Sequence, residues 1–399
     1  MTLLYEIIEM TMLVLMGFFA LYITLFAISG HFYRYGMDQQ ADKFLRIAVL
    51  VPGYKEDGVI LEAARSALTQ HYPMSLFDVV IIADSFELAT LEGLRSLPVK
   101  VIEVSFERST KAKALNQAME VLGEDYDIAV VLDADNLMDR NFLSQVNQSF
   151  QQGYKAVQGH RTAKNLNNSW AILDAISEEI NNHVFRKGHR AVGLSSAIIG
   201  SGMAFDYPYF KKMMSGIHAV GGFDKEIELK MLAAGDTIGY LDHAMVYDEK
   251  VQASEVFTNQ RRRWLAAQFH YFRTDFAKAL MAMIFEGKVD YFDKTIQFIL
   301  PPRILLMGAI LLSGLLFGVG NFLLRISFHF TLAWGILLGV YLTSLLISVP
   351  RKFFGWQTVR AVAGLPKGMM LMALALLRIR GVNKTFLHTP HTGSVPSKS

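Results

Sequence analysis

The sequence predicts an α/β domain with a mostly parallel sheet and helices on both faces, joined to transmembrane and interfacial helices. Three observations lead to this expectation. Apolar runs of strand length alternate with helix-like segments in the first third of the chain. Each run is continuously apolar, which is typical of strands buried on both faces. Longer apolar segments lie near the N-terminus and in the C-terminal third, and they have the length that a bilayer requires.

The strands and helices are predicted from length and hydrophobic pattern. The expected strands are 47–51, 79–83, 99–104 and 128–132. The expected helices between them are 59–70, 88–97 and 111–122. Strands that alternate with helices form parallel sheets, and such sheets bind ligands beyond the carboxyl ends of their strands. We therefore expect a ligand-binding site at that edge of the sheet.

Composition limits the possible classes of protein. Hydrophobic residues make up 52% of the 399 residues, and the mean hydropathy is +0.27. These values fit a soluble domain joined to a few membrane spans better than either part alone. The formal net charge of +3 predicts no nucleic-acid partner. The sequence contains no cysteine, which excludes disulfides, zinc thiolates and catalytic thiols.

The first candidate span is 11–30, which carries no charged residue. Glu6 and Glu9 precede it, whereas a secretory signal usually begins with basic residues, so we expect an uncleaved anchor. Basic residues follow the span closely. Basic flanks mark the cytoplasmic side of a span, so the domain that follows is expected in the cytoplasm, attached to the cell membrane.

Two further apolar runs, 304–324 and 330–349, predict a transmembrane hairpin, again with basic residues after its second arm. The run 368–377 is too short to span and predicts an interfacial helix. If that helix extends back through Ala361 it can cross, so both alternatives stay open. The expected division is an anchor at 1–30, an α/β domain at 31–265, interfacial helices at 266–303, a hairpin at 304–349, and an interfacial helix with a cytoplasmic tail at 350–399.

Polar clusters follow three of the predicted strands, and they converge at one edge of the sheet. The cluster "DADN" contains Asp133 and Asp135. In an extended chain, residues two apart point the same way. Two neighbouring carboxylates repel each other unless a divalent cation lies between them and a phosphate. An ordinary polar loop is the alternative interpretation.

The other two clusters suggest nucleotide binding. "VPGYKED" contains Pro52, Tyr54 and Glu56, and Asp84 ends the second run. An acidic side chain can accept from the imide N–H of a pyrimidine, and a tyrosine ring can stack on the base. The alternative is ordinary loop and helix-cap chemistry. Lys111 begins the segment "KAKALN", where it either reaches a diphosphate or is a solvated helix lysine.

Together these motifs resemble the family 2 glycosyltransferases, and specifically the membrane-embedded branch that includes cellulose, chitin and hyaluronan synthases. The resemblance covers about 47–264 and the flanking membrane segments. "VPGYKED", Asp84, "KAKALN" and "DADN" are similar to that family's nucleotide, second acidic, lysine and metal motifs. "GSGMAF" (200–205) lies where the family shapes its acceptor site. The resemblance implies a GT-A (Rossmann-like) fold and inverting transfer from a nucleotide-diphosphate sugar, expected to be UDP-linked.

The segment "QRRRW" is similar to the family's Q-x-x-R-W signature, at Gln260, Arg263 and Trp264. The resemblance implies that Arg263, helped by Gln260, holds the pyrophosphate and that Trp264 stacks near the acceptor sugar. A guanidinium group forms a planar fork for phosphate oxygens, and an indole face suits a sugar ring. The alternative is a juxtamembrane basic patch for anionic lipids, which stays open above all for Arg261 and Arg262.

The catalytic base is expected in "GGFDKEIELKML". The family has a Glu-Asp pair whose aspartate deprotonates the acceptor, and alignment on the following leucine puts Lys225 and Glu226 in those places. Glu226 is then the implied base, one methylene longer than usual. Alternatively Glu226 pairs with Lys230 on the helix surface. Asp224 is the rival base, although it also suits a helix N-cap.

The resemblance thus implies that Asp133 and Asp135 bind Mn²⁺ or Mg²⁺ and that a growing polysaccharide is elongated at the cytoplasmic membrane face. Single-step glycosylation of a lipid or lipid-linked acceptor is the alternative. An export partner or a second copy of the chain would be needed to complete a wide channel. A non-catalytic export subunit and a nucleotidyltransferase are the rivals from other classes. The loop "RKGHR" (186–190) is expected to cover the crevice or face lipid headgroups.

Overall fold

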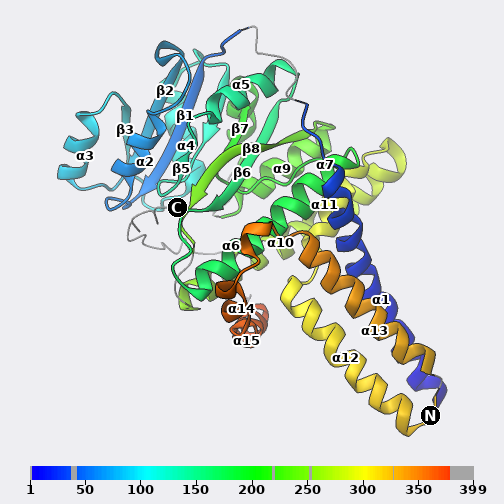
Figure 1. Cartoon of the computed structure of the whole chain (residues 1–399). Helices are drawn as coiled ribbons and strands as arrows, with labels where there is room; N and C mark the ends of the chain where they lie inside the picture. Colours follow the sequence, from blue (N-terminus) through cyan, green and yellow to red (C-terminus); the bar gives the residue numbers. More distant parts are fainter. Residues whose placement is uncertain (1, 37–42, 218–220, 251–253, 327, 378–399) are drawn as a thin grey trace.

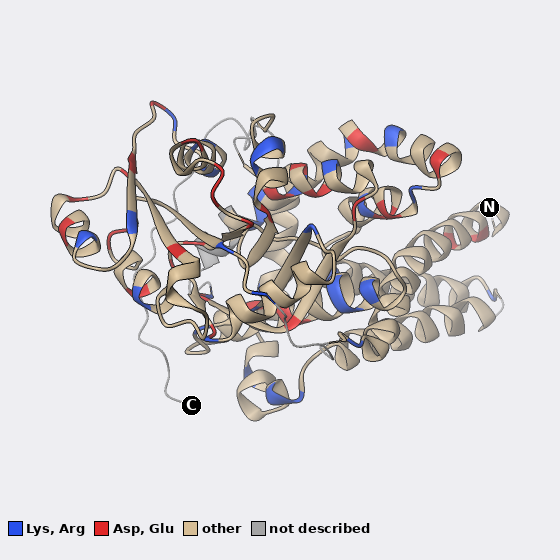
Figure 2. Cartoon of the chain, turned by 90° about the horizontal axis from the view of Figure 1, so that it is seen from above, with Lys and Arg blue, Asp and Glu red and all other residues tan. Residues whose placement is uncertain are grey.

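The computed structural model describes residues 2–36, 43–217, 221–250, 254–326 and 328–377. Figure 1 shows an α/β domain built on a sheet and an elongated bundle of three long helices that projects from it. In Figure 2 charged residues are spread over the domain, whereas the helices that lead to the N-terminus are mostly uncharged. The chain therefore combines a polar domain and an apolar bundle, as its composition predicts.

The sheet has eight strands in the order β3-β2-β1-β4-β7-β6-β8-β5. All four predicted strands are confirmed: β1 (Ile47–Tyr54), β2 (Phe77–Asp84), β3 (Lys100–Val104) and β4 (Ile128–Val131). Neighbours among these four pair in parallel. The three predicted helices are also confirmed: α2 (Ile60–Ala67), α3 (Leu88–Arg95) and α4 (Lys111–Leu122).

The strand β1 is apolar throughout because both of its faces are covered. Ala48 and Leu50 belong to a core that includes residues of α4, whereas Ile47, Val49 and Val51 pack in a second core with residues of α2. All five side chains are fully buried. Alternate residues of one strand thus enter two different cores, which is the arrangement that a continuously apolar strand indicates.

The second half of the sheet adds antiparallel pairs to a sheet whose neighbouring pairs are mostly parallel. β7 (Met203–Asp206) is antiparallel to both β4 and β6 (Ala156–Ala163), and β5 (Leu137–Met138) is antiparallel to β8 (Ile238–Asp248). Only β6 and β8 are parallel there. The α/β class is confirmed, and the sheet is mixed, because β7 and β5 run against their neighbours.

The remaining helical segments complete the domain and its connections. They are η1 (Gly30–Phe32), η2 (Met74–Leu76), α5 (Phe142–Gln151), α6 (Ser169–Asn181), the π-helical η3 (Asn182–Gly188), α7 (His189–Ala191), α8 (Tyr207–Met214), α9 (Phe223–Ala234), α10 (Ser254–Glu286), α11 (Val289–Ile299) and η4 (Arg351–Phe353). Helix α10 crosses the expected domain boundary at 265/266, so "QRRRW" lies inside a long helix rather than before one.

Three helices in the described part of the chain are long and apolar enough to cross a membrane. They are α1 (Thr2–Ser29) with η1, α12 (Arg303–Leu323) and α13 (Phe328–Ile347). α14 (Trp356–Val362) and α15 (Leu365–Leu377) would form a fourth span only if this pair, bent by 47°, counts as one. The three predicted spans are thus present as helices, the alternatives for the bent pair remain open, and the tail beyond 377 lies outside the described residues.

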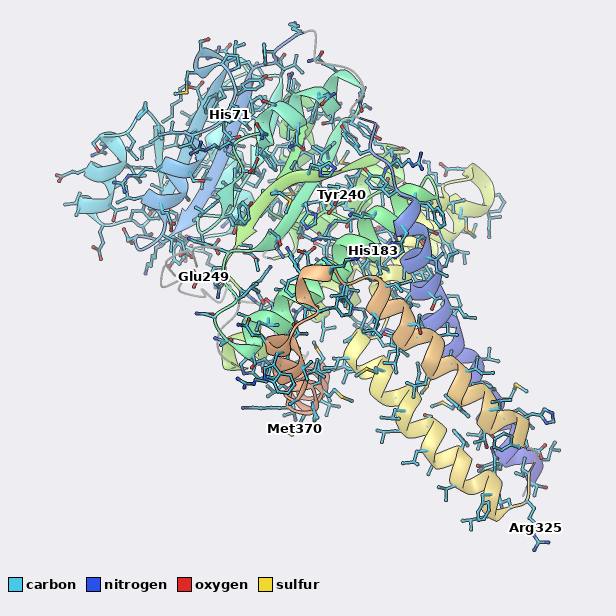
Figure 3. All side chains as sticks on the ribbon, in the orientation of Figure 1. His71, His183, Tyr240, Glu249, Arg325 and Met370 are labelled. Atoms are coloured by element: carbon cyan, nitrogen blue, oxygen red, sulfur yellow. The ribbon has the colours of Figure 1, made fainter. Side chains whose placement is uncertain are left out.

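Helix α1 begins well before the predicted span, so Glu9 lies inside it. The Glu9 carboxylate is fully buried and accepts hydrogen bonds from Asn321 Nδ2 at 3.0 Å and Trp334 Nε1 at 3.1 Å. Donors from α12 and α13 both reach Oε1, whereas Oε2 is buried without a hydrogen-bond partner among the described residues. A carboxyl group inside an apolar bundle requires such donors. The N-terminus and Arg325 lie at the end of the bundle remote from the sheet (Figures 1 and 3).

Candidate active site

The carboxyl ends of β1 and β2 meet through backbone contacts. Tyr54 ends β1 and lies opposite Asp84, which ends β2. Asp84 is buried and accepts from the Ser85 hydroxyl at 3.0 Å and, through its carbonyl, from Lys55 N at 3.1 Å. Lys55 and Ser85 both have positive φ angles, of 56° and 59°. Such angles are uncommon in non-glycine residues, and strained backbone of this kind gathers at functional sites.

The rest of "VPGYKED" forms the loop into α2. Pro52 lies within β1, and the Glu56 carbonyl accepts from Val59 N and Ile60 N at 3.2 and 3.1 Å, which starts the helix. Asp57 does not cap α2; its carboxylate accepts from Glu87 N at 2.9 Å and ties this loop to the one after β2. The hydrogen bond of Asp57 therefore joins the loops that follow β1 and β2. The nucleotide contacts of Pro52, Tyr54 and Glu56 stay predictions.

The "DADN" segment is a turn rather than extended chain. Asn136 N donates to Asp133 O at 3.1 Å, so the expectation that Asp133 and Asp135 align as residues of a strand is wrong. The turn is fixed from outside, because the Ser201 hydroxyl accepts from Asp133 N at 2.9 Å. Asp135 is 6% exposed, whereas the Asp133 side chain is 36% exposed. The two carboxylates thus have different environments.

Asn136 links the turn to the end of β8. In the amide orientation that satisfies both ends, its oxygen accepts from Ser201 Oγ at 2.6 Å and its nitrogen donates to Asp248 Oδ1 at 3.0 Å and Asp135 Oδ1 at 3.1 Å. Lys250 Nζ lies 2.8 Å from Asp248 Oδ2. Burial favours the protonated form of Asp248, but nearby cations, Lys250 foremost, hold its pKa below the usual value. Sequence reasoning missed Ser201 and Asp248, because only the fold brings them to the turn.

Lys111 lies beside the same turn and is not a solvated lysine. We call the site formed by Lys111, the "DADN" turn and "GSGMAF" the crevice. Its ammonium group donates to Asp133 Oδ1 and, at 2.6 Å, to the Gly200 carbonyl. It also lies 5.5 Å from the ring centroid of Phe223, the first residue of α9. The lysine, the "DADN" turn and "GSGMAF" are therefore in contact, although they come from separate parts of the chain.

The two candidate bases have different surroundings. A Cβ added at Gly200 would lie 3.8 Å from Asp224 Oδ2, which puts Asp224 beside the crevice. Gly222 is the N-cap of α9, so Asp224 does not have the capping role. Glu226 Oε1 lies 2.9 Å from Lys230 Nζ, in the helix-surface pair that was the alternative for this residue. The catalytic roles of Asp224 and Glu226 stay predictions.

The "QRRRW" segment lies in the first half of α10. Arg261 Nη2 donates to Asp174 of α6 at 2.6 Å, and its guanidinium carbon lies 4.6 Å from the centroid of the Trp264 ring. Arg261 therefore binds a neighbouring helix rather than serving only lipids. Burial lowers the pKa of Arg263, which shows that its guanidinium is partly withdrawn from water. Donor binding by Gln260 and Arg263, and acceptor stacking by Trp264, stay predictions.

The family is decided by a match between residues 45–267 and the profile described as "Glycosyltransferase like family 2". The chain belongs to this family. No curated protein matches it. Among solved structures it is similar to the mannosyltransferase PcManGT from Pyrobaculum calidifontis, in complex with GDP-Man and Mn²⁺. The identity is 16% and the TM-score 0.54, over 86% of this chain and 97% of that one. This likeness supports the GT-A fold. The family match makes the chain an enzyme of the glycosyltransferase class that uses a nucleotide sugar.

The basic side chains of "RKGHR" in this glycosyltransferase have partners within the protein. Arg186 is 1% exposed; its Nε donates to Ala197 O at 3.3 Å and its Nη1 lies 3.3 Å from Glu178 Oε1. Lys187 Nζ lies 2.6 Å from Asp242 Oδ2. The segment covers the end of the π-helical η3 and the start of α7, and its basic residues have carboxylate and carbonyl partners inside the protein.

The crevice of the glycosyltransferase offers two carboxylates to a metal, Asp133 and Asp135. Among the described residues no cluster of three or more His, Asp or Glu side chains is placed to bind one. Carboxylate oxygens are the ligands that Mg²⁺ and Mn²⁺ prefer, and in phosphate-transferring sites Mg²⁺ takes one or two of them together with phosphate oxygens. The residues therefore fit a cation that reaches full coordination only with a diphosphate.

A buried histidine joins two carboxylates at the β6–β8 pair. His160 Nε2 lies 3.0 Å from Glu179 and His160 Nδ1 3.1 Å from Asp242. Burial raises the carboxyl pKa values, but hydrogen bonds and nearby cations, His160 foremost, together lower the pKa of both Glu179 and Asp242 to about 2. For His160, burial lowers the pKa, but the two carboxylates raise it by more, so the pKa lies above its usual value.

We expect His160→Asn to lower the free energy of unfolding at pH 7 by about 3 kcal/mol, because two buried carboxylates each lose a charge-assisted hydrogen bond. Thr162 and Lys352 still contact Glu179, and Lys187 still contacts Asp242. The lowered carboxyl pKa values stabilise the fold above the unfolded values near 4, and this stabilisation is lost as the pH falls towards 2. The raised His160 pKa stabilises the fold below about 6.5 and is lost as the pH rises through the folded value. Thermal unfolding in detergent, from about pH 7 to 3, should show the difference from wild type shrinking as the acids are protonated.

The matched control is His71→Asn, since His71 is exposed and bonds Asn141 at 3.0 Å (Figure 3). It should unfold like the wild type across the series. A His160→Asn protein whose deficit is constant with pH would contradict the linkage.

Proposed function

We propose that this glycosyltransferase transfers a sugar, with inversion, from a nucleotide-diphosphate sugar to a saccharide acceptor at the cytoplasmic face of the membrane. The observation that carries the proposal is the contact of Lys111, Asp133 and Gly200, beside Asp224, at the carboxyl ends of the strands in a family 2 domain. The α12–α13 hairpin and the end of α1 nearest the sheet would place this crevice at the membrane surface (Figure 1).

The residues divide into donor and acceptor groups. Asp133 and Asp135 would hold Mn²⁺ or Mg²⁺, and when bound the ion offsets negative charge on the departing nucleotide. Arg263, with Gln260, binds the diphosphate through its planar guanidinium. Asp224 accepts the proton of the acceptor hydroxyl as that oxygen attacks the anomeric carbon. Asp224 is preferred over Glu226 because Asp224 lies beside Gly200, whose carbonyl binds Lys111. Each acid has a lysine neighbour, but Lys225 Nζ is 3.6 Å from Asp224, whereas Lys230 Nζ is 2.9 Å from Glu226.

The donor is proposed to be a UDP-sugar, with GDP-mannose as the competing donor. The UDP preference rests on the resemblance of "VPGYKED" and Asp84 to a pyrimidine site. GDP-mannose enters because PcManGT was solved with it. A donor panel that includes both nucleotides decides between them.

A growing polysaccharide is the first candidate acceptor, because the Q-x-x-R-W pattern resembles that of polymerising enzymes. A lipid-linked acceptor that is extended once is the second. It is favoured by the small number of spans, three or at most four helices in the described part of the chain, which is few for one chain to enclose a wide channel. The polymer hypothesis therefore needs an export partner or a second copy.

The test uses the full chain in lipid with Mn²⁺ and radiolabelled UDP-glucose, UDP-N-acetylglucosamine and GDP-mannose. We expect one donor to release its nucleoside diphosphate in a metal-dependent way, and the size of the labelled product distinguishes a polymer from a single addition. Release of pyrophosphate would identify a nucleotidyltransferase. If no donor is consumed, a non-catalytic export subunit becomes the better interpretation.

A further inference from the structure

We propose that helix α11 positions the acceptor side of the crevice and links it to the membrane anchor, with Lys294 and Glu228 as the positioning residues. The inference rests on the proposed function for its readout. Figure 1 shows α11 next to α1 at the base of the domain. One turn of α11 carries three charged residues, Asp290, Asp293 and Lys294, and each contacts a different part of the protein. We call these three residues the α11 clamp.

The first contact fixes the start of the loop that leads to Gly200. The Asp290 carboxylate accepts from Ser195 N at 2.9 and 3.0 Å and also from the Ser195 hydroxyl. The same hydroxyl oxygen accepts from Ile238 N, at the first residue of β8, at 3.0 Å. Ser195 is therefore held between α11 and the sheet.

The second contact is a buried ion pair. Lys294 Nζ lies 2.7 Å from Glu228 Oε1, and the two side chains are only 3% and 2% exposed. The same Glu228 oxygen accepts from Ile198 N at 3.2 Å. The clamp thus holds the loop at Ser195 and, through Glu228, at Ile198, two residues before Gly200, beside which the proposed base Asp224 lies.

The ion pair is poorly explained as a source of stability alone. Burial raises the pKa of Glu228 even though Lys294 opposes the rise. Burying the Glu228 carboxylate therefore costs free energy that Lys294 does not fully offset, and buried pairs of this kind are often replaceable by apolar side chains. What an apolar pair would not reproduce is the directed bond from Ile198 N to the Glu228 carboxylate.

The ion pair also orients the proposed base. Asp224 and Glu228 are four residues apart on α9 and so lie on the same face of the helix. Fixing Glu228 against α11 sets the rotation of α9, and this rotation keeps Asp224 beside Gly200. A displacement of 1 Å at a reacting group can lower a rate by about a hundredfold. Loss of this rigid support should therefore affect the transfer rate more than the stability of the fold.

The third contact reaches the membrane anchor. Asp293 Oδ1 accepts from the Tyr22 hydroxyl of α1 at 2.7 Å, and Asp293 Oδ2 lies 3.3 Å from His189 Nε2. The His189 ring stacks on Phe26 of α1, with centroids 3.6 Å apart. An acceptor that comes from the membrane would therefore meet a base whose helix is connected, through α11, to the anchor itself.

The test compares Lys294→Met, Glu228→Gln and the double variant with the wild type, using the donor that the panel identifies. Two rates are measured, transfer to acceptor and hydrolysis of the donor without acceptor, together with the KM for donor. We expect each single variant to lower transfer by about tenfold or more while hydrolysis and the donor KM change by less than about twofold. The double variant should lose less than the product of the two single losses, because the residues act as one unit.

The control is Lys211→Met, which removes a lysine that lies 2.6 Å from Glu124, whose side chain is 68% exposed, far along the chain from the clamp. It should leave both rates unchanged. If a single variant does not fold, the double variant decides alone, because neither charge of the Lys294–Glu228 pair remains in it. An unchanged ratio of transfer to hydrolysis in the folded double variant overturns the proposal. A wild type that consumes no donor overturns the proposed function instead.

Tyr22→Phe tests the link to the anchor without touching the domain. Loss of the hydroxyl should lower the ratio of transfer to hydrolysis by about threefold in lipid, because one hydrogen bond to a charged group is removed. Equal falls in both rates would show that the contact serves folding only.

Discussion

Replacing Asp135 by alanine should lower the kcat for transfer by about a thousandfold or more. Asp135 is 6% exposed, and its Oδ1 accepts from the Asn136 amide nitrogen at 3.1 Å. Asn136 is held in turn by hydrogen bonds with Asp248 and Ser201. Charge stabilisation in such a water-poor site is preorganised, so its loss has a larger effect than a surface charge would have. The measurement is kcat at saturating donor, with nucleotide binding titrated in the presence and absence of Mn²⁺.

The variant should still bind nucleotide, but Mn²⁺ should no longer strengthen that binding. Asp139→Asn is the matched control, because it changes an acid four residues further along the chain. Among the described hydrogen bonds, the Asp139 side chain accepts only from Asn141 N, at 3.0 Å. Its kcat should stay within about twofold of the wild type, as for most substitutions away from a site. Wild-type metal dependence in Asp135→Ala would remove Asp135 from the metal site.

The first half of the fold could be predicted because three of its strands, β1, β2 and β4, are buried on both faces by apolar residues. β6 could not, since its sequence "AVQGHRTA" places Gln158, His160 and Arg161 in the buried interior. Their partners include Glu178 and Glu179 of α6, which are close to β6 only after folding. A pattern of apolar residues does not reveal a strand whose polar side chains are satisfied by distant charges.

The same distinction applies to Glu9. An acid at the start of an apolar run looks like a boundary when the run is read alone. It becomes an interior residue once Asn321 and Trp334, more than 300 positions away, donate to its carboxylate. Hydropathy located the spans correctly, but partner donors on other helices decide where a span begins.

In the site, sequence motifs identified the charged residues but not their supports. Lys111 and Asp133 belong to separate motifs, and the structure shows that they are bonded to each other. Ser201 and Asn136 complete the turn, yet a serine and an asparagine in loops carry no signal of their own. The geometry of such supports depends on β7 and β8, the part of the sheet that was predicted least well.

The choice between the two candidate bases gives the second large expected effect. Asp224→Asn should lower transfer by about 10²- to 10⁴-fold, the usual contribution of a positioned general base, and leave donor affinity unchanged. Asparagine keeps the size of the side chain and removes only its capacity to accept a proton. The measurements are the transfer rate, donor hydrolysis without acceptor and the Kd for donor.

Glu226→Gln provides the matched comparison, two positions along the same helix. The Glu226–Lys230 pair is a partly exposed i,i+4 contact, and such pairs contribute about 0.3–0.5 kcal/mol, so we expect transfer to fall by no more than about threefold. The reverse result, with transfer lost in Glu226→Gln and kept in Asp224→Asn, would support the alignment with the family's Glu-Asp pair instead. It would also mean that Glu226 leaves Lys230 when an acceptor binds, because a carboxylate bound to an ammonium group is a poorer proton acceptor than a free one.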